Sequence, residues 1–148
     1  MMKTRVLIAG FLLTLQIGQA NADVSRPNHG VVVKGDLPFS EAVKVNETLY
    51  LSGQVGLVPA TQKLISGGIT AESRQTMDNI SQVLTSQGYK MDDVIKCTVF
   101  LSDMKDFPSF NGVYKDYFKP DHLPARSTVA VSGLAMNAKV EVECFAAK

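Results

Sequence analysis

The chain has 148 residues, of which 45% are hydrophobic, 7% aromatic and 20% charged, and its formal net charge is +1. This composition can bury a core and excludes a disordered or collagen-like chain. The balanced charge argues against a nucleic-acid-binding protein, and two cysteines are too few for a disulfide-scaffolded miniprotein. The length indicates one globular domain.

The first 22 residues have the pattern of a secretory signal peptide. Lys3 and Arg5 precede an apolar run over residues 6–17, and an Ala-Asn-Ala cleavage motif follows at 20–22. The alternative is an apolar N-terminal helix that stays on the protein. Cleavage would remove two basic residues and no acidic one, which changes the formal net charge from +1 to −1. The pattern therefore predicts a periplasmic or secreted protein with no membrane anchor after cleavage, and it weakens a nucleic-acid partner further.

The mature chain begins with a polar stretch and then enters the predicted domain, residues 37–148. Residues 23–36 contain proline and glycine and predict a flexible tail. Residues 41–52 predict two short strands joined at Asn46-Glu47, and 59–68 a loop. Thr70 is the expected N-cap of a helix over 71–87, which has apolar residues at helical spacing and stops at Gly88.

The second half of the domain alternates strand and helix patterns in the same way. Residues 94–101 predict a strand, and an aromatic stripe over 107–118 predicts a helix whose aromatic side chains form core rather than a cofactor site. Two further strands are expected over 127–132 and 139–146, paired as a hairpin that places Glu141 opposite Ala130. The order ββαβαββ predicts an α+β fold with one mixed β-sheet and two helices on one face.

One face of this sheet is left uncovered by the chain itself. The expected helix-facing residues are Val43, Val45, Val129, Val131, Val140 and Val142, and the residues expected on the opposite face are Thr128, Ala130, Glu141 and Glu143. A two-layer fold with a mixed open face is commonly covered by another copy of the chain. We therefore expect an oligomer.

The cysteines and histidines do not form a metal site in the sequence. Cys97 and Cys144 fall on the apolar faces of alternating runs, which favours two buried structural cysteines and leaves a disulfide as the alternative. His29 and His122 are isolated and lack ligand spacing. No metal ion is expected.

Several segments together resemble the reactive intermediate deaminase family (RidA, also called YjgF). The resemblance runs over residues 38–146, and its most specific segment is Pro-Ala-Arg-Ser-Thr-Val-Ala-Val at 124–131, followed by Leu134 and Val-Glu-Val at 140–142. The matching segments that precede it, in the same order as in the family, are Ser-Gly-Gln-Val at 52–55, Arg-Gln-Thr-Met-Asp-Asn at 74–79, the strand at 96–101, and Asn111 with Tyr114.

The resemblance implies a chorismate-mutase-like homotrimer with three clefts between subunits. The implied activity is hydrolysis of 2-imino or enamine acids, such as 2-iminopropanoate and 2-iminobutanoate, to 2-keto acids and ammonia. An imine hydrolyses readily once water and charge are positioned, so no cofactor is needed. The alternatives are a non-catalytic trimer that binds small carboxylates or client proteins, and, more distantly, an endoribonuclease.

Arg126 and Glu141 are the expected catalytic residues. The planar fork of Arg126 suits a substrate carboxylate, and Glu141 can orient or deprotonate the attacking water. Gly53 allows close approach of the main chain to a ligand, and Asn111 is a further expected contact. The structural alternatives are a surface arginine, an interface carboxylate, a strand end and a helix-packing asparagine.

Two positions depart from the family pattern. Phe39 stands where relatives commonly carry a tyrosine, which replaces a polar ligand contact with an apolar wall and favours larger or more hydrophobic substrate side chains. Thr128, a further expected substrate contact, stands where relatives often carry cysteine, so no thiol role transfers. In the predicted hairpin Arg126 and Glu141 would lie roughly 13 Å apart, too far for one small ligand. We therefore hypothesise a site composed of Arg126 and Glu141 from different subunits.

Overall fold

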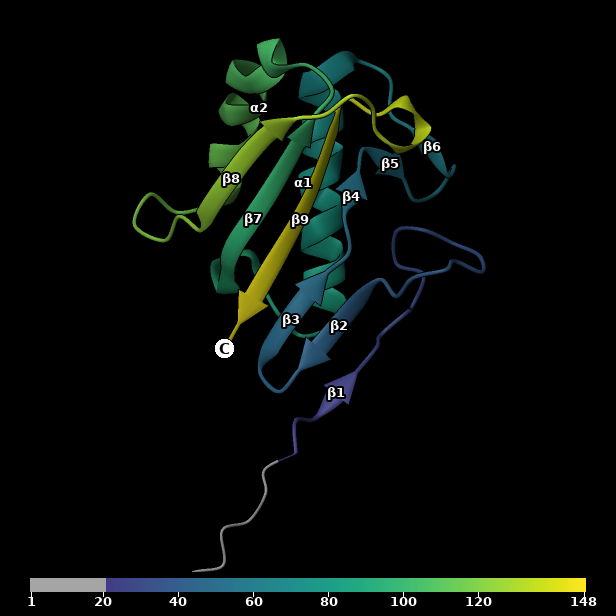
Figure 1. The fold of residues 1–148 in the computed structure, drawn as a ribbon, viewed down its shortest axis with the longest axis vertical. Coiled ribbons are helices and arrows are strands. Elements are labelled where there is room, and N and C mark those ends of the chain that lie inside the picture. The colour runs from purple at the N-terminus through teal and green to yellow at the C-terminus, as the bar shows by residue number, and fades with distance from the viewer. Residues whose placement is uncertain (1–20) are drawn as a thin grey trace, which may run out of the picture.

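The computed structural model of the protein describes residues 21–148, so nearly all of the predicted signal peptide lies outside the described residues. Within that described range no helix is long and apolar enough to cross a membrane. The domain is one mixed sheet that lies in front of two α-helices in Figure 1. This arrangement confirms the α+β prediction.

The main sheet has the strand order β1-β2-β3-β9-β7-β8. Strand β3 pairs with the C-terminal end of β9, and β4 pairs with an earlier part of β9, at Glu141 and Val142. Only the pair β7–β8 is parallel. β5 and β6 form a separate two-stranded sheet, and β6 lies within the stretch predicted as a loop. The strands are β1 (Val24–Ser25), β2 (Ala42–Val45), β3 (Thr48–Leu51), β4 (Gln54–Val55), β5 (Leu57–Val58), β6 (Lys63–Leu64), β7 (Val94–Leu101), β8 (Ala125–Ala130) and β9 (Val140–Ala147).

Two α-helices and four short 3₁₀ helices complete the fold. Helix α1 (Gly68–Ser86) packs on α2, β4 and β9, and α2 (Phe107–Tyr114) continues into a 3₁₀ turn. The 3₁₀ helices are η1 (Met91–Asp93), η2 (Met104–Asp106), η3 (Lys115–Tyr117) and η4 (Ala135–Asn137). The aromatic stripe of α2 is core, as predicted, with Phe110 fully buried.

The predicted N-cap of the first helix is wrong. The cap is Gly67, with φ 119° and ψ 9°, and Thr70 lies inside the first turn. Glycine reaches this left-handed conformation without the steric penalty that a side chain adds, and a Cβ there would also lie 2.9 Å from Ala71 Cβ. By contrast, the hairpin at Asn46-Glu47 is confirmed, and Asn46 takes the positive φ of 51° that such a tight turn needs.

The predicted pairing of the last two strands is also wrong. Strand β7 lies between β8 and β9, so Glu141 faces Phe100 on β7 and has no pairing with Ala130. Helix α2 makes a crossover connection from β7 to β8, which brings β8 beside β7 in the parallel sense and leaves β9 for the other side.

This topology also changes which side chains share a face. In register, Arg126 pairs with buried Cys97 and Thr128 with buried Val99, so Thr128 faces the helices and Val129 faces away from them. On β2, Val43 and Val45 pair with Tyr50 and Thr48 on the open face, contrary to the prediction. Val140 and Val142 are buried on the helix side, and Glu141 and Glu143 alternate to the other side as expected.

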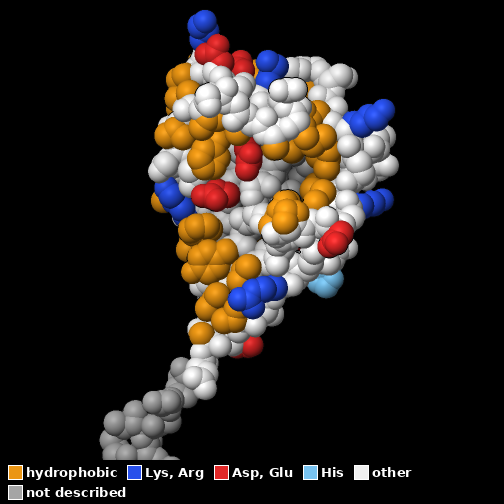
Figure 2. Space-filling model, turned by 45° about the vertical axis from the view of Figure 1, so that its right-hand side comes forward, with side chains coloured by type: hydrophobic (Ala, Val, Ile, Leu, Met, Phe, Trp, Pro, Cys, Tyr) orange, Lys and Arg blue, Asp and Glu red, His pale blue; other side chains and the backbone are white. Residues whose placement is uncertain are grey.

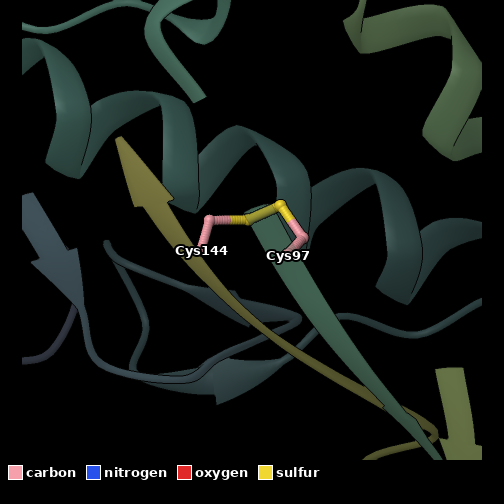
Figure 3. Close-up of a disulfide and its surroundings, with 2 residues drawn as sticks. All are labelled: Cys97 and Cys144. Atoms are coloured by element: carbon pink, nitrogen blue, oxygen red, sulfur yellow. A yellow bond between two sulfur atoms is a disulfide. The ribbon is translucent and has the colours of Figure 1, made fainter. Parts of the chain in front are cut away.

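A disulfide joins the two central strands inside the core. Cys97 of β7 and Cys144 of β9 lie directly opposite each other, 4.1 Å apart at Cα, and both are fully buried beneath α1 (Figure 3). The predicted burial is confirmed, and the alternative of a disulfide is the observed state. Sequence periodicity gives the face of each cysteine but not the pairing of their strands.

The segment predicted as a flexible tail is partly built into the domain. Val24–Ser25 forms β1 on the edge of β2, and Val32 is 1% exposed. The backbone N–H of Val32 donates to Glu41, and the amide of Gln62 both donates to the Val32 carbonyl and accepts from the N–H of Lys34. Residues 32–34 are thus fixed against the domain beside β4 and β5.

Candidate functional site

Arg126 lies at the sheet edge, on the face that α2 covers. Its guanidinium carbon is 4.7 Å from the ring centroid of Tyr114, and 5.7 and 5.8 Å from those of Phe107 and Phe110. The three rings hold the guanidinium by cation–π attraction, and no carboxylate in the described residues forms a salt bridge with it. Its hydrogen-bond donors therefore remain available for an anionic ligand.

A cavity of about 460 Å³ opens beside this arginine, lined by Asn111, Tyr114, Lys115, Leu123, Pro124 and Arg126. Three buried polar atoms have no hydrogen-bond partner within residues 21–148. Asn111 Oδ1 and the Tyr114 hydroxyl belong to residues that line the cavity, and Thr128 Oγ1 lies two residues from Arg126 on β8. Burial raises the pKa of Tyr114 to about 12 despite the opposing charge of Arg126, so the phenol stays neutral at physiological pH. Buried polar atoms ordinarily find partners, so these three groups mark a place prepared for a polar ligand or water.

Glu141 and Gly53 form a second, separate group. Glu141 is half-buried on β9, paired with Val55 of β4, and its carboxylate lies against the Gly53 backbone. A Cβ at position 53 would lie 2.1 Å from Glu141 Oε1, so any larger residue there would displace the carboxylate from its present place. Burial first, and the charge of Glu143 second, raise the pKa of Glu141. A raised pKa suits a carboxylate that exchanges protons with water near neutral pH.

The cavity that contains Glu141 is otherwise apolar. It has a volume of about 250 Å³ and is lined by Val33, Phe39, Gly53, Val55, Leu57, Ala135, Met136 and Glu141. Phe39 and Met136 lie at its rim and are about half exposed, at 49% and 53%. In Figure 2, which brings the β5–β6 side of the molecule forward, hydrophobic side chains surround a central hollow that has acidic side chains near it.

The structure does not bring Arg126 and Glu141 together within one subunit. Arg126 is in register with Cys97 on the helix side, whereas Glu141 is in register with Phe100, three residues along β7 and on the opposite face. From strand spacing their Cα atoms are about 14 Å apart, and their side chains point to opposite sides of the sheet. Gly53 and Phe39 accompany Glu141, and Asn111 and Thr128 accompany Arg126.

Sequence reasoning missed several residues that shape these cavities, among them Tyr114, Val33 and Met136. Tyr114 was matched to the family but not recognised as the platform for Arg126, although its i+4 spacing from Phe110 places both rings on one face of α2. Val33 lay in a predicted tail and Met136 in a predicted connection, so neither carried a periodic signal.

No group of three or more metal-ligating side chains occurs within the described part of the chain.

Comparison with known proteins identifies relatives that cover nearly all of the domain. The family model described as endoribonuclease L-PSP matches residues 33–148. The 2-iminobutanoate/2-iminopropanoate deaminases of Mus musculus and Homo sapiens are 42% and 39% identical over 109 residues, which is 74% of this chain and 80% and 79% of those proteins. A solved structure of a protein of the conserved Rid family from Yersinia pestis is 36% identical, with a TM-score of 0.81, and covers 85% of this chain and all of that one.

Proposed function

This chain belongs to the reactive intermediate deaminase (RidA/YjgF) family and is a RidA-type deaminase, and we propose that it hydrolyses 2-imino acids such as 2-iminopropanoate and 2-iminobutanoate. The observation that carries the proposal is a pair of half-sites, namely the cavity beside Arg126 and the cavity that contains Glu141. One offers an unpaired guanidinium for a carboxylate, and the other offers a half-buried carboxylate with a raised pKa for water.

The reaction follows from these two groups. Arg126 binds the carboxylate of the 2-imino acid through two parallel charge-assisted hydrogen bonds. Glu141 accepts a proton from water while the water oxygen bonds to C2 and the C=N double bond becomes single. Glu141 then returns the proton to nitrogen, which gives a C2 carbinolamine with one hydroxyl and one NH2 group. It next takes the proton of the C2 hydroxyl and passes it to the NH2 group, so the C2–N bond breaks, ammonia leaves, and the C2–O bond becomes the carbonyl of the 2-keto acid. Each step conserves atoms and needs no oxidant.

The two half-sites act on one ligand only if they come from different subunits. Arg126 and Glu141 occupy different patches, so each subunit gives one patch to one neighbour and the other patch to the next. Such head-to-tail contacts close into a ring, and the family resemblance favours three members. The open sheet face supports the same assembly, because Tyr50 and Val129 are more than 40% exposed there, and the ring of Phe145 packs against that of Tyr50 with centroids 4.9 Å apart.

Subunit mixing tests this proposal directly. Arg126→Ala and Glu141→Gln subunits carrying different tags are co-expressed, and mixed oligomers are isolated by two successive affinity steps. Every mixed trimer with a shared site contains one interface with both wild-type residues, so about one third of wild-type activity should return. Each homomeric variant is the inactive control.

Failure to regain activity in verified mixed trimers would contradict the shared site. A wild-type protein that binds pyruvate but accelerates no imine hydrolysis would instead be a non-catalytic carboxylate-binding protein. Imine loss is followed after an amino-acid oxidase generates the imine in the presence of a trapping amine.

Export to the periplasm or the medium is also part of the proposal. Its support is the signal-peptide pattern of residues 1–22 together with the fully buried disulfide, since disulfides persist in oxidising compartments. A fusion of residues 1–22 to a reporter that is active only outside the cytoplasm checks it. A reporter retained inside the cell would overturn this part alone.

A further inference from the structure

The walls of the Glu141 cavity are more apolar than hydrolysis of the smallest imines requires. Apart from Gly53 and Glu141, every residue that lines its volume of about 250 Å³ is Val, Phe, Leu, Ala or Met. A methyl or ethyl side chain would leave much of this apolar surface uncovered. A longer substrate side chain would bury it, and each additional methylene buried favours binding by about fourfold.

Three chain segments build the apolar walls and each is held in place. Val33 is fixed between the hydrogen bonds that Glu41 and Gln62 make to its two neighbours. Strands β4 and β5 supply the floor, and the side-chain amide of Asn79 donates to the carbonyls of Val55 and Leu57. The cavity is therefore a preformed surface that pays little ordering entropy on binding.

The fourth wall comes from the connection between β8 and β9. Met136 has φ 59° inside η4, a left-handed conformation that projects it at the cavity rim. The backbone N–H of Lys139 donates to the buried carboxylate of Glu72 at 2.7 Å and anchors the end of this connection. Phe39 stands at the same rim and, like Met136, is about half exposed in the protomer.

We propose that this cavity is the side-chain subsite of the enzyme. It selects 2-imino acids with branched or aromatic apolar side chains over the three-carbon acid 2-iminopropanoate and the four-carbon acid 2-iminobutanoate. The inference rests on the proposed deaminase function. With the imine carbon beside Glu141, the substrate side chain extends among Val33, Phe39 and Met136, while the carboxylate faces the neighbour's Arg126. The preferred imines are those derived from leucine and phenylalanine.

The test compares imines that share the reacting atoms and differ only in side chain. An L-amino-acid oxidase generates imines from alanine, 2-aminobutyrate, leucine and phenylalanine, and kcat/KM is measured for the purified oligomer. We expect the leucine-derived imine to exceed the alanine-derived one by at least tenfold, mainly through KM. Equal kcat/KM for all four would overturn the subsite and leave the deaminase function intact.

A variant pair isolates the wall from the chemistry. Met136→Asn puts a polar side chain at the rim, and asparagine tolerates the left-handed conformation there. It should reduce the leucine-to-alanine ratio of kcat/KM about threefold or more. Met104→Asn is the matched control, since Met104 is 44% exposed and lines neither cavity. An unchanged ratio in the Met136 variant would contradict the assignment.

Binding of the keto-acid products separates this inference from failure of the deaminase function. Calorimetry with pyruvate and 4-methyl-2-oxopentanoate needs no turnover. Tighter binding of the branched acid, with no hydrolysis of any imine, would remove the proposed reaction and keep the subsite. Equal or absent binding of both acids would remove the subsite.

Discussion

The cavity beside Arg126 and the cavity that contains Glu141 differ in the chemistry of their lining residues. Around Arg126, aromatic rings hold a permanent cation, and several buried polar atoms have no hydrogen-bond partner among the described residues. Around Glu141, apolar side chains surround one carboxylate whose pKa burial raises. The first cavity can fix a charge and the second can activate water next to an apolar chain. Neither has both abilities, which shows why the folded protomer is only half of the proposed enzyme.

Loss of the cation should have the largest effect. Arg126→Ala removes both charge-assisted hydrogen bonds to the substrate carboxylate, so kcat/KM should fall by about 100-fold or more. Arg126→Lys is the matched control, because lysine keeps the charge and loses the planar fork, and it should recover only part of the activity. Steady-state kinetics on leucine-derived imine measure both. An Ala variant within fivefold of wild type would exclude Arg126 from the site.

Loss of the carboxylate should lower kcat more than it raises KM. Glu141→Gln keeps the size of the side chain beside Gly53 and removes its basicity, so kcat should fall by about 100-fold. In wild type, kcat should decline as pH falls through the raised pKa of Glu141, because the protonated acid cannot accept a proton from water. A pH–rate profile with no acid limb above the ordinary glutamate range would contradict this role.

The raised pKa of Glu141 also affects stability, but in the opposite direction along the pH scale from its effect on kcat. A carboxyl group whose pKa is higher in the folded state binds protons more tightly when folded. Its contribution to folding is therefore fully favourable below the unfolded pKa and is lost as pH rises through the folded pKa. Glu141→Gln removes this dependence, so thermal melts should show the variant gaining on wild type as pH rises from 4 towards 8, by a small amount that suits a half-exposed group. If Tm changed with pH in the same way for wild type and variant, the raised pKa of Glu141 would be contradicted.

Strands β7 and β9 separate the two cavities, and their disulfide should matter for stability rather than for either chemistry. Cys97 is in register with both Cys144 and Arg126, and the bond closes a loop with a sequence separation of 47. Replacing both cysteines by alanine should cost about 3–4 kcal/mol and lower Tm by roughly 10 °C. At 25 °C kcat/KM should stay within about twofold for a folded variant. A large activity loss at unchanged Tm would instead make the disulfide part of the site.

The sequence predicts the helices and most strands because each has its own periodicity. The apolar spacing of α1 identified that helix, but its start depends on the left-handed Gly67, which periodicity does not reveal. Strands β8 and β9 both alternate, and alternation does not say which strand becomes the neighbour. The predicted hairpin failed for that reason, and with it the assignment of Thr128 and Val129 to faces.

The site residues divide in the same way. Arg126 and Glu141 could be proposed from the sequence because they lie in segments that match a family, and Gly53 because it follows a strand. Val33 and Met136 were not found, since their positions depend on tertiary contacts: the hydrogen bonds from Glu41 and Gln62 to the neighbours of Val33, and the left-handed backbone of Met136. Walls built from loops carry no periodic signal, although they decide which side chain a substrate can have.

The smallest expected effect concerns a single oxygen atom at the rim of the apolar cavity. Phe39→Tyr adds a hydroxyl to this ring, and because the ring is 49% exposed the added group can stay partly hydrated in the free protein. A large substrate side chain would desolvate that hydroxyl without a new partner, whereas a small one would leave it in water. The leucine-to-alanine ratio of kcat/KM should therefore fall about threefold while Tm stays unchanged. If the ratio rose instead, the tyrosine would be a favourable contact for large imines, and Phe39 would not be the source of apolar selectivity.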